Sequence, residues 1–91
     1  MMYSVKFTKE ATDNIVALPV KKKRQIRDGI QRIAVDPSLG KCLTNKLIGL
    51  YSYRSGDYRI IYKILHQQVL IIVLAIGHRK DIYKKVSKKP L

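Results

Sequence analysis

Cysteine, acidic residues and long hydrophobic runs are all scarce in this sequence. Cys42 is the single cysteine among 91 residues, which excludes an intramolecular disulfide and a cysteine metal cluster and fits a reducing cytosol. The longest hydrophobic run, from Val69 to Ile76, is far shorter than the ~20 residues that span a bilayer. No basic start followed by a hydrophobic run marks a signal peptide. We therefore expect a soluble, cytoplasmic protein without membrane contact.

Basic residues outnumber acidic ones by nineteen to six, which gives a net charge of +13 and a pI of about 10.1. Such a field attracts polyanions, including RNA, DNA and acidic protein segments, but charge alone does not choose among them. No grouping of His, Asp and Glu resembles a metal site, and no glycine-rich loop is suited to cradle a phosphate. We expect neither a metal ion nor another cofactor.

The first half of the chain predicts a strand followed by two helices. Hydrophobic residues alternate from Tyr3 to Phe7, as in a half-buried strand. Thr8 can cap a short helix whose hydrophobic residues recur at helical spacing. The second helix carries a stripe of isoleucines and ends at Asp36-Pro37. Gly29 lies within it and should let another element approach closely.

The second half predicts three strands, over residues 50–54, 58–65 and 69–77, joined by turns at 55–57 and 66–68. The last strand is almost entirely hydrophobic, which is typical of the centre of a sheet. The lysine-rich tail, residues 84–91, is expected to be flexible. The expected fold is α+β in one domain, residues 1–91. It is an antiparallel sheet with the helical hairpin on one face, and the other face collects basic and aromatic residues.

Two short segments each place an arginine at the edge of a strand and a tyrosine shortly after it. They are Gly56–Tyr62, which contains Arg59, and Gly77–Tyr83, which contains Arg79. The two strands form a hairpin, so both arginines lie at its open end and can converge, and Arg54 across the preceding turn could join them. A guanidinium stays charged and forks onto phosphate oxygens. The alternative is that all three arginines simply face solvent.

Tyr83 and His78 are the further candidates for chemistry. Tyr83 follows Arg79 by four residues, so it could stack on a base, assist proton transfer or pack the C-terminal segment. His78 could act as a general acid or base near neutral pH. In a regular strand, however, His78 would face away from the side on which Arg79 lies.

Basic residues elsewhere predict a broad surface for the phosphate backbone of RNA, with a plain solvated surface as the alternative. One group lies at the start of the second predicted helix. The other is divided between the loop that precedes the three predicted strands and the segment that follows the last of them. The members are Lys21, Lys22, Lys23, Arg24, Lys46, Lys80, Lys84 and Lys85.

Several segments along nearly the whole chain match the landmarks of one family. The most specific are Tyr53–Tyr62 and Gly77–Tyr83. The others are Tyr3–Thr8 with Ala11, Leu18-Pro19, Asp36-Pro37 and Leu47–Tyr51. With these segments the sequence resembles the RelE/ParE superfamily, the toxins of type II toxin–antitoxin systems.

The resemblance implies a microbial RNase-like fold and a metal-free endonuclease that cuts messenger RNA in the ribosomal A site. In that chemistry the 2′-hydroxyl attacks the adjacent phosphate and the 5′-oxygen leaves. Arg59 resembles the arginine that holds the scissile phosphate, and Arg79 resembles the one that stabilises the transition state. Tyr83 resembles the tyrosine that stacks on the base, and Arg54 resembles a supporting basic residue.

The resemblance also implies partners and leaves alternatives. A RelB-like antitoxin is expected to neutralise the toxin, the ribosome and mRNA are expected targets, and the toxin–antitoxin pair could bind operator DNA. The lysines that the family places before the turn are replaced by Leu50 and Ser52, so the base would come from His78, Tyr83 or Lys46. A ParE-like gyrase inhibitor and a catalytically inactive, antitoxin-bound regulator remain as alternatives.

Overall fold

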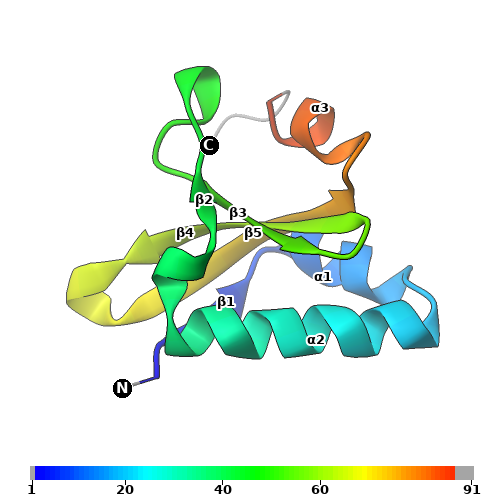
Figure 1. Ribbon diagram of the computed structural model, residues 1–91, viewed down its shortest axis with the longest axis horizontal. Coiled ribbons are helices and arrows are strands. Elements are labelled where there is room, and N and C mark those ends of the chain that lie inside the picture. The colour runs from blue at the N-terminus through cyan, green and yellow to red at the C-terminus, as the bar shows by residue number, and fades with distance from the viewer. Residues whose placement is uncertain (1, 88–91) are drawn as a thin grey trace.

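A five-stranded sheet with the order β1-β5-β4-β3-β2 organises the chain. The computed structural model describes residues 2–87. The strands are β1 (Ser4–Phe7), β2 (Lys41–Cys42), β3 (Tyr51–Ser55), β4 (Tyr58–Leu65) and β5 (Leu70–His78). The helices are α1 (Lys9–Val16), α2 (Val20–Val35) and α3 (Ile82–Ser87), with short 3₁₀ turns at Pro37–Leu39, Asn45–Leu47 and His66–Gln68. Figure 1 shows α1 and α2 below the sheet and α3 above it.

The α+β class and the helical hairpin on one face are confirmed. The antiparallel expectation holds from β2 to β5, but β1 runs parallel to β5, with Ser4 opposite Leu70. A tight turn forces neighbouring strands to be antiparallel, whereas β1 and β5 are far apart in the chain and no turn sets their direction. The strand predicted to be central, β5, lies between β1 and β4, and the middle strand is β4.

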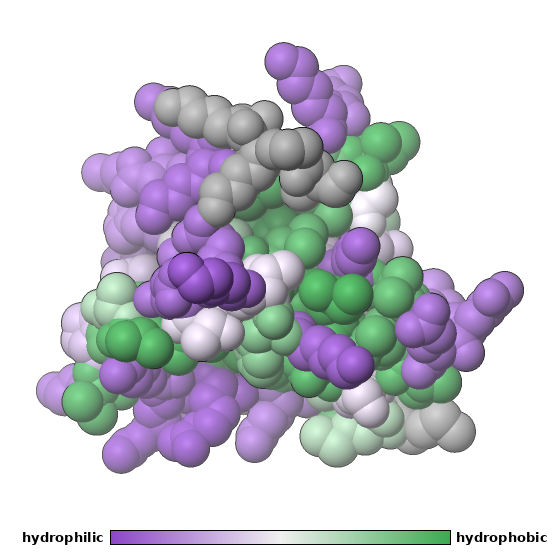
Figure 2. All heavy atoms as spheres, turned by 180° about the vertical axis from the view of Figure 1, so that it is seen from behind, coloured by the Kyte–Doolittle hydropathy of each residue, from purple (hydrophilic) through white to green (hydrophobic). Residues whose placement is uncertain are grey.

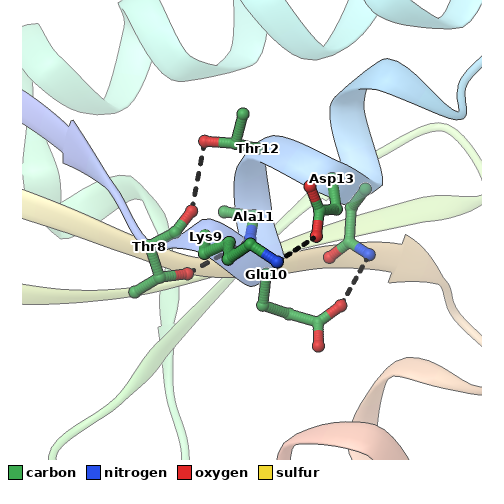
Figure 3. A network of polar contacts seen from close by, with 7 residues as sticks. Thr8, Lys9, Glu10, Ala11, Thr12 and Asp13 are labelled. Carbon is green, nitrogen blue, oxygen red and sulfur yellow. Dashed lines mark hydrogen bonds and ion pairs between the residues drawn. The ribbon is translucent and has the colours of Figure 1, made fainter.

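The start of α1 is fixed by a network of polar contacts (Figure 3). The Thr8 hydroxyl accepts a hydrogen bond from the Ala11 amide at 3.1 Å and donates to the Leu74 carbonyl at 2.7 Å. Further along β5, the Ile76 amide donates to the Asn14 side chain at 3.0 Å. The cap predicted at Thr8 is therefore confirmed, and it also ties the helix to β5.

The main core lies between α2 and the sheet. Ile26 and Ile33 of α2 are at most 1% exposed and pack with Ile60 of β4 in one cluster. Gly29 makes this approach possible, because a Cβ there would lie 3.1 Å from Ile60 Cδ1 and 3.2 Å from Tyr53 Cε2. The close contact predicted at Gly29 is confirmed.

Tyr62 is the largest fully buried side chain. Its hydroxyl donates to the Pro37 carbonyl at 2.7 Å and accepts from the Gly40 amide at 3.0 Å, so it fastens the segment after α2 to the sheet. The ring also stacks on Tyr51, with centroids 5.6 Å apart. Burial raises the pKa of the Tyr62 hydroxyl to about 12.

We expect Tyr62→Phe to lower the free energy of unfolding by about 1–2 kcal/mol, because it leaves a backbone donor and acceptor without their partner. The pKa of Tyr62 is raised in the folded protein, so the hydroxyl's contribution is complete below pH 10 and is lost as the pH rises towards 12. Urea unfolding of both proteins across this range should show their difference narrowing. A difference that stays constant with pH would contradict the assignment.

A second hydrophobic cluster lies on the opposite face of the sheet, under α3. Ile82 and Val86, one turn apart on α3, are 0% and 4% exposed and pack on Ile61 and Ala75. Gly77 leaves room for this helix, because a Cβ there would lie 3.0 Å from Ile82 Cδ1. This face is therefore partly covered.

The flexible tail predicted for residues 84–91 is corrected by α3. Residues 84–87 belong to that helix, because the buried side chains of Ile82 and Val86 hold it against the sheet. The rest of the predicted tail, residues 88–91, lies outside the described residues. Across residues 2–87, no helix has both the length and the hydrophobicity to cross a membrane.

Candidate nucleic-acid site

The face of the sheet that carries α3 also carries two arginines side by side. Arg54 of β3 and Arg59 of β4 are directly opposite each other in the register, and the next pair on the same face is Ser52 with Ile61. Because side chains alternate along a strand, this face also includes Gly77, which is opposite Arg59 on β5. The tight turn at Gly56, where φ is +62°, sets this register.

Neither guanidinium has a strong protein partner. Arg54 Nε donates to the Gly56 carbonyl at 3.4 Å, and Arg59 Nη1 donates to the Tyr58 carbonyl at 3.5 Å, both long contacts. No carboxylate of the described residues lies within ion-pair distance of either one. Like charges directly opposite each other on a sheet are destabilising. A bound anion would relieve this repulsion, and a phosphate matches the guanidinium fork.

Arg79 lies at the same end of the sheet. Its side chain is exposed, and its backbone amide donates to the Asp57 carbonyl at 2.8 Å. This bond joins the end of β5 to the turn between β3 and β4. The structure thus brings Arg54, Arg59 and Arg79 to one end of the sheet, as the hairpin argument predicted.

His78 lies on the other face. Its ring contacts the Tyr58 ring edge-on, with centroids 5.9 Å apart, and Nδ1 accepts from the Lys80 amide at 3.2 Å. The amine of Lys22, from α2, lies 5.9 Å from the centroid of the same Tyr58 ring. His78 therefore lies on the face of the sheet that the helical hairpin covers, and the sheet separates it from Arg59.

Tyr83 is brought to the arginine face by α3. Its hydroxyl forms a 2.9 Å hydrogen bond with the Ser52 hydroxyl, and its side chain is 36% exposed. The exposed part borders an open hollow of about 440 Å³ between α3 and the turn at residues 45–47. Lys46 and Lys84 line the same hollow, together with Thr44, Asn45 and Leu47. An aromatic ring beside two amines can stack a base and attract its phosphate.

The two positions that lack the expected lysines have other tasks. Leu50 is 5% exposed and packs in the cluster under α3, and Ser52 is 6% exposed and engaged with Tyr83. Neither can act as the general base by itself. Of the three groups considered for that task, Tyr83 and Lys46 share the hollow, while His78 is across the sheet.

The remaining predicted basic residues fall into two places. Lys80 lies just before α3 and Lys85 lies within it, and both are exposed. Lys21, Lys23 and Arg24 are exposed at the start of α2, where Lys23 and Arg24 line a separate hollow of about 360 Å³. Figure 2, seen from behind, shows hydrophilic side chains along the left part of the lower edge, where Figure 1 places the start of α2. The α2 group thus lines a different hollow from Tyr83 and Lys46.

Sequence reasoning missed the contributions of Ser52, Thr44 and Asn45. The sequence marks Ser52 only as a missing lysine, although its alternation with Arg54 places it on the same face. Thr44 and Asn45 lie in an irregular segment without periodicity, so no sequence signal pointed to them. In residues 2–87 no cluster of three or more His, Cys, Asp or Glu side chains could hold a metal ion.

Comparisons with known proteins agree with this architecture. Residues 5–83 match the family model described as the ParE toxin of the type II toxin–antitoxin system parDE. The chain is 31% identical to Toxin RelG of Mycobacterium tuberculosis over 87 residues, and this match covers 93% of this chain and 100% of that protein. Toxin RelE of the same organism is 38% identical over 52 residues, covering 57% of this chain and 54% of that protein.

Solved structures show the same fold. A chain of the RelBE2 toxin–antitoxin complex from Mycobacterium tuberculosis superposes with a TM-score of 0.81 at 28% identity, covering 87% of this chain and all of that one. A chain of the archaeal RelE–RelB complex from Pyrococcus horikoshii gives a TM-score of 0.70 at 27% identity, with coverages of 87% and 97%. The fold is therefore shared, over 87% of this chain, with chains of solved toxin–antitoxin complexes.

Proposed function

The chain belongs to the RelE/ParE superfamily of toxins of type II toxin–antitoxin systems, and from this membership we propose that it is a ribosome-dependent endoribonuclease that cuts messenger RNA without a metal ion. The observation that carries the proposal is the pair Arg54 and Arg59. They are opposed on one sheet face without a carboxylate partner among the described residues, and Tyr83 is held on that face. Such a face suits a single-stranded RNA phosphate and its base.

In the proposed reaction the scissile phosphate binds against Arg59, with Arg54 beside it and Arg79 at the same sheet end. The 2′-oxygen attacks phosphorus as its proton passes to a base. The bond to the 5′-oxygen breaks, and that oxygen takes up a proton. The products are a cyclic 2′,3′-phosphate and a 5′-hydroxyl. Guanidinium groups stabilise the charge that develops on the phosphoryl oxygens, and they need no metal to do so. Tyr83 and Lys46 are the groups of the hollow that could move the protons.

A protein antitoxin is the proposed partner. The related toxins were solved in complexes of RelE with RelB. The net charge of +13 favours an acidic or amphipathic segment that folds over the basic surface. We also propose that the pair, rather than the toxin alone, binds operator DNA.

The test is brief expression under tight control, with mapping of messenger RNA ends within minutes. Cleavage confined to translated codons is expected. Intact messenger RNA together with a DNA-damage response would overturn the proposal in favour of gyrase inhibition. Intact messenger RNA and normal growth would instead indicate an inactive toxin kept as an antitoxin-bound regulator.

Lys46→Ala is expected to weaken binding of single-stranded RNA and to lower the slope of log affinity against log salt by about 0.7, the value of one phosphate contact. Arg27→Ala is the matched control, because Arg27 is exposed on α2 and borders the separate hollow. Fluorescence anisotropy with a labelled 2′-O-methyl RNA between about 50 and 200 mM salt measures both slopes. A slope for Lys46→Ala equal to that of the wild type would place Lys46 outside the RNA path.

A further inference from the structure

Ser52 and Tyr83 form the hydrogen bond that links α3 to the arginine face. Their hydroxyl oxygens are 2.9 Å apart, and this is the one side-chain hydrogen bond of either residue in the described part of the chain. Ser52 is 6% exposed, so its hydroxyl has little access to water. A buried hydroxyl that lost this partner would be left unsatisfied, which makes the bond hard to replace.

The helix alone does not fix the ring of Tyr83. α3 has six residues, fewer than an isolated helix needs for stability, so packing on the sheet holds it in place. Ile82 and Val86 provide that packing from one side of the helix, and Tyr83 is on a different side, partly exposed. The bond to Ser52 is what sets the hydroxyl end of the ring relative to β3.

Ser52 also relates this ring to the phosphate-binding arginines. It precedes Arg54 by two residues on the same face of β3, and its cross-strand neighbour Ile61 is two residues from Arg59. A strand rises about 3.3 Å per residue, so Ser52 and Arg54 are one repeat of roughly 6.6 Å apart along the face.

We propose that Ser52 is a positioning residue for RNA cleavage: it holds the Tyr83 hydroxyl so that the exposed ring faces a nucleotide base while Arg54 and Arg59 hold the adjoining phosphate. This inference rests on the proposed function. Ser52 stands where the family resemblance implies a lysine, and it serves here to orient the tyrosine. The substrate class is a single-stranded ribonucleotide segment, bound across the hollow that Tyr83 shares with Lys46.

The test is a double-mutant cycle on the cleavage of ribosome-bound messenger RNA by the full chain. Ser52→Ala should lower kcat/KM by about five- to tenfold, Tyr83→Phe should lower it by at least as much, and the double variant should be no slower than Tyr83→Phe alone. Ser52→Thr keeps the hydroxyl and should restore most of the activity when Tyr83 is present. Thermal midpoints measured in parallel identify any general loss of folding.

The outcomes of this test separate the positioning role of Ser52 from the proposed cleavage of messenger RNA. If Ser52 had only a structural role, Ser52→Ala would lower the thermal midpoint. It would also lower the cleavage rate by the same factor in the wild type and in the Tyr83→Phe variant. Such additive losses would overturn the positioning role while cleavage by the wild type stands. Wild-type activity in Ser52→Ala would overturn it as well. If the wild type does not cleave ribosome-bound RNA, the proposed function fails, and the inference fails with it.

Discussion

Replacing Arg59 with alanine is expected to lower the rate of RNA cleavage by about 100- to 1,000-fold, the usual loss when one preorganised charge donor to a transition state is removed. Arg59 is half-buried on β4, directly opposite Arg54, and its guanidinium is free to meet a phosphate because its protein contact is a long 3.5 Å bond to a carbonyl. Single-turnover cleavage of ribosome-bound messenger RNA measures the effect.

The melting temperature of Arg59→Ala shows whether a loss of activity comes from a loss of folding. The substitution removes a repulsion between like charges on neighbouring strands, so the melting temperature should stay within a few degrees of the wild type. Arg59→Lys keeps the charge but loses the fork, and should recover only part of the rate. Arg27→Ala, on the exposed side of α2, should cleave normally. Full activity of Arg59→Ala would refute the proposed phosphate site.

Replacing Ile82 with alanine is expected to lower the free energy of unfolding by about 2–5 kcal/mol. Ile82 is 0% exposed and packs in the cluster with Ile61 and Ala75, and its Cδ1 occupies the space above Gly77. Small domains are stable by about 5–15 kcal/mol, so the loss is a large part of the total. The first consequence should be release of α3, which removes Tyr83 from Ser52.

The exposed isoleucine Ile48 is the matched control, since 78% of its surface is already in solvent and its removal leaves no cavity. Denaturant unfolding compares the two variants, and hydrogen exchange of the α3 amides shows whether that helix opens before the sheet. If Ile82→Ala unfolds at the same denaturant concentration as Ile48→Ala, then α3 does not depend on the cluster beneath it.

Much of the candidate site follows from local pattern. The turn at residues 55–57 joins two strands with few alternatives for their register, which places Arg54 opposite Arg59. Alternation along β5 likewise put His78 on the side away from the arginine face, where it lies against Tyr58. Gly29 within the isoleucine stripe predicted the close approach of α2 to the sheet. Each of these features depends on neighbours in the chain or on one strand period.

The sequence by itself determined the α+β class, the hairpin whose open end carries arginines, and the positive charge that favours a polyanionic partner. Only the tertiary structure decided that β1 runs parallel to β5, that residues 84–87 form a helix, and that Tyr83 meets Ser52 across 31 residues. Periodicity specifies which face of an element is buried, but it does not specify the direction in which a distant element packs. For α3 that direction is set by the fit of Ile82 over Gly77, which no local pattern records.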